Sequence, residues 1–101
     1  MSFTREQKKL INLIQKWFDL NEIETEDTVF YTKEAWLRRG ESYCNDESVV
    51  LNITTEGPFN HILNMYDGVE LFDSFCTLLD DAGYWFEMGT SWYLCIYKSE
   101  A

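Results

Sequence analysis

Apolar side chains recur at helical spacing near the start of the chain, at Leu10, Leu13, Ile14, Trp17 and Phe18. Residues three and four apart share one face of an α-helix, so the pattern predicts an amphipathic helix with one face in a core. Thr4 followed three residues later by Gln7 matches a capping box, which places the start of the helix in this turn. The helix is expected to end near Leu20 or Asn21.

A second long helix is predicted from Asp67 to Gly83. Asp67 would cap it, with Glu70 at the reciprocal position of a capping box, and Gly83 would end it. The apolar side comprises Val69, Leu71, Phe72, Phe75, Cys76, Leu78, Leu79 and Ala82. The opposite side comprises Glu70, Asp73, Ser74, Thr77, Asp80 and Asp81. This helix should therefore pack on a core and hold its carboxylates in solvent.

Two hairpins are predicted from alternating segments. Residues 49–54 alternate like a half-buried strand, and residues 55–58 have turn chemistry. Residues 59–64 are expected to return as the partner strand, although a helix that opens at Pro58 is the alternative. The second hairpin joins residues 84–88 to residues 92–97 through a short loop that contains Gly89.

The two faces of this terminal hairpin are expected to carry different side chains. One face is expected to carry Tyr84, Phe86, Met88, Trp92, Leu94 and Ile96. The other is expected to carry Trp85, Glu87, Tyr93, Cys95 and Tyr97. Such an aromatic face must be buried within the monomer or serve as an interface, and the first helix is expected to bury it. A dimer or partner surface is the alternative.

The length of 101 residues predicts a single domain over residues 1–101. A short apolar segment at residues 29–31 is compatible with a strand. Thr32 can cap a small helix over residues 33–39, with Gly40 as its left-handed stop. The predicted class is α+β: two main helices packed on a small, mostly antiparallel sheet built from two hairpins.

Charge divides the chain unequally. Between Gly40 and Tyr97 there is no lysine or arginine, and that stretch holds ten of the 18 carboxylates. The net charge is −10 and the pI about 4.3. Phosphate backbones and anionic membranes attract clustered cations, so direct binding to nucleic acid or to a membrane is not expected. The field instead favours a protein partner with a basic surface.

The three cysteines, Cys44, Cys76 and Cys95, predict reduced thiols, because the count is odd and the N-terminal residues lack the apolar core of a signal peptide. We therefore expect a cytoplasmic protein without a disulfide framework. The spacing of these cysteines and His61 lacks the close ligand pairs of structural zinc sites. Neither a metal nor a cofactor is predicted.

Catalytic signatures are weak throughout the sequence. His61 is the only histidine, and no motif surrounds it, so a partly buried structural role is expected. Cys76 and Cys95 lie among carboxylates and apolar groups, which would raise their pKa and make them poor nucleophiles. The chain is predicted not to be an enzyme. A small enzyme that uses Asp or Glu for acid–base chemistry remains an alternative.

The functional prediction is a small non-enzymatic interaction or regulatory protein. Asp80 and Asp81 oppose the dipole in the last turn of their helix, which suggests that their carboxylates serve a purpose. The predicted acidic contacts are Glu70, Asp73, Asp80 and Asp81. The predicted aromatic contacts are Trp85, Tyr93 and Tyr97. A second copy of the chain is an alternative partner, and a nucleic-acid charge mimic that inhibits a DNA- or RNA-handling protein is an alternative function.

Overall fold

The structure is a computed structural model that describes residues 3–26, 28–40, 48–66, 68–90 and 93–99. Its elements in chain order are α1 (Arg5–Leu20), β1 (Phe30–Tyr31), α2 (Lys33–Arg38), β2 (Val49–Thr54), α3 (Pro58–Leu63), α4 (Glu70–Ala82), β3 (Tyr84–Thr90) and β4 (Tyr93–Lys98). The predicted α+β class is confirmed, as are its two main helices, α1 and α4.

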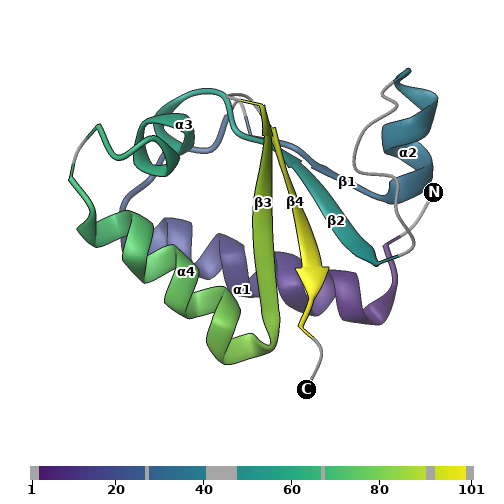
Figure 1. The fold of residues 1–101 in the computed structure, drawn as a ribbon, viewed down its shortest axis with the longest axis horizontal. Helices are drawn as coiled ribbons and strands as arrows, with labels where there is room; N and C mark the ends of the chain where they lie inside the picture. Colours follow the sequence, from purple (N-terminus) through teal and green to yellow (C-terminus); the bar gives the residue numbers. More distant parts are fainter. Residues whose placement is uncertain (1–2, 27, 41–47, 67, 91–92, 100–101) are drawn as a thin grey trace.

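The four strands form one antiparallel sheet in the order β1-β2-β4-β3 (Figure 1). The terminal hairpin is confirmed as β3 and β4, with Trp85 opposite Tyr97 and Phe86 opposite Ile96. Strand β3 continues to Thr90, so Gly89 lies in the strand and not in the loop as expected. The other predicted hairpin is wrong, because β2 pairs with β4 and not with the segment that follows it. In this central pair Ile53 lies opposite Leu94.

The segment expected to return as a strand forms the short helix α3, which was the alternative interpretation. Gly57 caps it with a φ of 85°, a conformation that other residues rarely adopt. Pro58 follows at the first helical positions, where its fixed φ suits a helix and its missing N–H costs nothing. Together they favour a helix start over a turn between strands.

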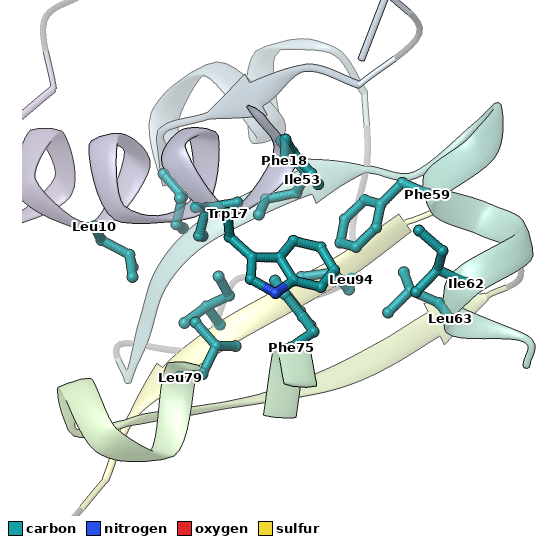
Figure 2. Close-up of a cluster of buried hydrophobic side chains, with 13 residues drawn as sticks. Leu10, Trp17, Phe18, Ile53, Phe59, Ile62, Leu63, Phe75, Leu79 and Leu94 are labelled. Carbon is teal, nitrogen blue, oxygen red and sulfur yellow. The ribbon is translucent and has the colours of Figure 1, made fainter. Parts of the chain in front are cut away.

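Helices α1 and α4 supply the core on one face of the sheet (Figure 2). The buried cluster draws on α1, the sheet, α3 and α4, and includes Leu10, Ile14, Trp17, Phe18, Leu51, Ile53, Phe59, Phe75, Leu79, Leu94 and Ile96. The Trp17 ring lies 5.2 Å from the Phe75 ring, and its Nε1 donates to Ser74 Oγ at 2.9 Å. One side chain thus joins the two main helices by packing and by a hydrogen bond.

The two main helices differ in how closely they match their predicted starts. The capping box of α1 is confirmed, since Thr4 Oγ1 accepts from the Gln7 N–H and Gln7 Oε1 accepts from the Thr4 N–H. The predicted capping box of α4 is wrong. That helix begins at Glu70 with Val69 as its N-cap and no side-chain cap, and Asp67 lies outside the described residues.

The helix that packs on the second face of the sheet is α2, over β1, β2 and Tyr93, and not the first helix as expected. Thr32 caps α2 as predicted by accepting from the Ala35 N–H. The helix then buries Trp36 completely against Tyr31, at 5.4 Å between rings, and Tyr93, at 5.1 Å. The hairpin's aromatic face is therefore occupied around Tyr93 by the chain itself.

Candidate docking surface

A shallow groove of about 360 Å³ runs between α4 and β3. The two elements are joined by Gly83, whose φ of 90° ends the helix and turns the chain straight into the strand (Figure 1). The groove is lined by Cys76, Thr77, Leu79, Asp80, Tyr84, Trp85 and Phe86. The ring of Phe86 packs on the rings of Phe75, at 5.2 Å between centroids, and Phe72, at 6.2 Å. We call these lining residues the acidic groove.

The four predicted acidic contacts are all exposed on α4, but they do not lie together. Asp80 lines the acidic groove, and Asp73 is close enough to Cys76 to affect its pKa. Asp81 points about 100° away from Asp80 and shares the side of Ser74, which faces α1. Glu70 lies about 15 Å along the helix from Asp80. Asp80 therefore lines the groove and Asp73 lies about two turns before it on the same side of α4, whereas Glu70 and Asp81 lie apart from this side.

The three predicted aromatic contacts also separate. Trp85 is 46% exposed, and its ring stacks on Tyr97 at 4.3 Å with an interplanar angle of 18°. Tyr97, the other ring of this stack, is half-buried. Tyr93 is only 1% exposed because it packs on Trp36. Trp85 is thus the aromatic side chain that offers surface beside the groove, and Tyr93 offers none.

Glu87 is a further acidic residue of this region that the sequence-based site left out. It is exposed on β3 opposite Cys95, two positions from Trp85 on the same face of the strand. The strand alternation already placed these two residues together. That pattern was the signal that could have identified Glu87.

Cysteine behaviour follows the prediction at one position and departs from it at another. Cys76 has a free thiol at the edge of the groove, and burial, followed by the charge of Asp73, raises its pKa as expected. Cys95, expected to be reduced, is disulfide-bonded. Cys44 lies outside the described residues. Disulfide formation depends on the distance between sulfurs in space, which neither the cysteine count nor the spacing reveals.

Tyr84 connects the start of β3 to α1. Its hydroxyl donates to Glu6 Oε2 at 2.9 Å, and Lys98 Nζ lies 3.2 Å from the same oxygen. Burial, together with the bond to Glu6, raises the pKa of Tyr84 to about 12. The hydrogen bonds from Tyr84 and then Lys98 lower the pKa of Glu6.

We expect Tyr84→Phe to lower the free energy of unfolding at neutral pH by about 0.5–1.5 kcal/mol, through loss of this hydrogen bond. A raised pKa in the folded state means that the Tyr84 contribution is complete below pH ~10 and is lost as the pH rises toward about 12. The lowered pKa of Glu6 gives a contribution that is lost in acid. Denaturation at several pH values should show both losses of stability. Phenolate absorbance should show that Tyr84 titrates late. If wild type and variant contain the same late-titrating phenol, the assignment to Tyr84 is wrong.

The charge around α4 changes sign across the helix. On its α1 side, a second groove of about 420 Å³ is lined by Lys9, Leu10, Asn12, Leu13, Lys16, Ala82 and Tyr84. On the β3 side, none of the described residues that line the acidic groove is a cation. Asp80 is therefore the charged side chain that a partner at the β3 side would meet among the described lining residues.

The described part of the chain gives less support to a site at His61, to a metal site or to a membrane span. His61 is exposed on α3, with its ring 5.5 Å from that of Tyr66, so the expectation of partial burial is wrong. Among the described residues, no group of three or more histidine, cysteine, aspartate or glutamate side chains is placed to hold a metal ion. No described helix has the length and apolar character needed to cross a membrane.

The lining of the acidic groove thus combines an exposed tryptophan, a free thiol and one carboxylate, that of Asp80. None of these supplies a catalytic base with a nucleophile and an orienting group. Comparisons of this chain with protein-family models, with curated protein sequences and with solved structures find no match.

Proposed function

We propose that this protein is a non-enzymatic interaction module that docks its acidic groove on a basic surface of a protein partner. One observation carries the proposal: Asp80 and exposed Trp85 both line one groove, and its described lining contains no cation. An aromatic anchor flanked by charges of one sign is a typical arrangement for recognising a protein surface of opposite charge.

The indole of Trp85 is well suited to be the anchor. Its stack on Tyr97 restrains the ring before any partner arrives, so little conformational freedom is lost when the partner covers it. Tryptophan is also enriched among the residues that dominate binding energy. Burial of the exposed part of this ring would supply affinity, while the carboxylates select the partner.

The carboxylates favour a protein partner over the role of a nucleic-acid mimic. Such a mimic needs a contiguous stripe of charges, whereas Asp80 and Asp81 point to different sides of α4. Glu87 lies with Trp85 on the face of β3 that points away from α4, so it does not continue the row of Asp80 either. Discrete charges around an aromatic anchor support docking on a folded or extended polypeptide.

We expect the Asp73→Asn/Asp80→Asn variant to bind a partner captured from native extract about three- to tenfold more slowly at low salt. Charges near an interface mainly accelerate encounter, so the dissociation rate should change little. Association rates should be measured by stopped flow across a salt series. The wild-type rate should fall steeply with salt, because screening shortens to ~8 Å at physiological ionic strength, and the variant should show a shallower slope.

A matched control is Glu70→Gln/Asp81→Asn, which removes two charges from α4 outside the groove. It should retain most of the wild-type rate. Trp85→Ala should instead raise the dissociation rate by more than tenfold, as expected for an anchor residue. If both charge variants slow association equally, only the net charge matters and the groove is not the docking site.

A further inference from the structure

Strand β3 is an open edge of the sheet. The strand order β1-β2-β4-β3 leaves its outer side without a neighbouring strand among the described residues. It spans seven residues, whereas β1 at the opposite edge spans two. The long edge is therefore the one next to the acidic groove.

The ladder with β4 fixes which backbone groups of β3 point outward. Ser99 N donates to Gly83 O at 2.9 Å, so that pair is hydrogen-bonded. Hydrogen-bonded and non-hydrogen-bonded pairs alternate along antiparallel strands. Trp85 and Glu87 therefore bond to β4, while Phe86 and Met88 direct their N–H and C=O groups to the open edge.

This edge lacks several common protections against strand addition, and its charged side chain is Glu87. Proteins commonly protect open edges with lysine, proline or a central irregularity. Strand β3 contains neither lysine nor proline, and its register shift comes only between Met88 and Thr90. Regular ladder positions are thus available from Tyr84 to Met88, next to exposed Trp85.

Charge discriminates between the two kinds of strand that this edge could accept. A second copy of the chain would bring a second set of the same carboxylates, Asp80 and Glu87, to the shared edge, and like charges close together are unfavourable. An extended segment that carries lysine or arginine would meet opposite charge. The acidic flank therefore opposes self-pairing and favours a basic strand.

We propose that an extended basic segment of a partner protein adds to β3 as a fifth strand. This rests on the proposed docking function and specifies its mode. Alternate side chains of the added strand would face α4, where Asp73 and Asp80 lie, and the opposite face, where Trp85 and Glu87 lie. Backbone bonds to Phe86 and Met88 supply affinity, and the carboxylates select lysine or arginine.

Amide hydrogen exchange read by NMR tests this mode directly. The probe is a blocked peptide as long as β3 in which lysine and valine alternate. In the free protein the amides of Phe86 and Met88 should exchange quickly, while those of Trp85 and Glu87 are protected by β4. Saturating peptide should slow exchange at Phe86 and Met88 at least tenfold, because these amides then donate to the added strand.

Two matched pairs sharpen the test. Peptides N-methylated on odd or on even residues should differ in affinity at least tenfold, since only one set points its N–H groups at β3. Asp80→Asn should weaken peptide binding about three- to fivefold, whereas neighbouring Asp81→Asn should leave it unchanged.

Three outcomes overturn the proposal. If the peptide binds without protecting Phe86 and Met88, and both methylated peptides bind equally, edge addition is wrong while acidic docking stands. If a peptide with glutamate in place of lysine binds as well as the basic one, both proposals fail. If Phe86 and Met88 become protected without peptide as protein concentration rises, a second copy occupies the edge.

Discussion

Replacing Phe75 with alanine is expected to lower the free energy of unfolding by about 3–5 kcal/mol. The Phe75 ring is fully buried where α1, α3, α4 and β3 meet. It lies 5.2 Å from the Trp17 ring, 5.1 Å from Phe59 and 5.2 Å from Phe86. Alanine would leave a cavity beneath the acidic groove. The surrounding rings are held by their own packing, so they cannot move in to fill it. Urea unfolding at neutral pH measures the loss.

Asp73→Lys is the matched control, because it changes an exposed position two residues away on the same helix. Stability should be unchanged or slightly higher, since the lysine relieves repulsion between Asp73 and Glu70 across one turn. If Phe75→Ala costs less than about 1 kcal/mol, or if Asp73→Lys prevents folding, the assignment of the buried and exposed faces of α4 is wrong.

Elements with strong local signals were predictable from sequence. Helix α1 combines a capping pair, Thr4 and Gln7, with a long apolar stripe, and both are properties of neighbouring residues. The β3–β4 hairpin likewise follows from alternation around a short loop. In these cases the residue pattern and the tertiary structure agree, so local reasoning was sufficient.

Short apolar segments could not be assigned in the same way. Residues 58–63 are too few to distinguish a strand from a helix by periodicity, and α3 was decided by Gly57 and Pro58 at its start. The disulfide state of Cys95 depends on proximity in three dimensions. Both depend on information that lies outside the local pattern.

The candidate site was predictable in composition but not in arrangement. The pattern correctly placed the α4 carboxylates in solvent. Whether Asp80 or Asp81 faces β3 depends on how α4 is rotated against the sheet, and that rotation is set by Phe75 and Leu79 in the core. The burial of Tyr93 depends on α2, whose position no sequence signal indicated.

Replacing Trp36 with alanine should cost about 3–5 kcal/mol and release α2 from the sheet. Trp36 is fully buried and is the only residue of α2 to be so, and it packs on Tyr31 and Tyr93. The guanidinium of Arg39 lies 5.5 Å from its ring and adds a cation–π contact. A helix of six residues is too short to persist without such packing.

Unfolding experiments should therefore show the loss of stability, and hydrogen exchange should show that amides of residues 33–38 lose protection before the rest of the chain. Trp36→Phe is the control, because it keeps an aromatic ring against Tyr93 and should lose less than half as much. If Trp36→Ala leaves these amides protected, α2 is held by other contacts. Loss of α2 would uncover Tyr93 and extend the aromatic surface around Trp85, so the variant should also bind apolar dyes more strongly than wild type.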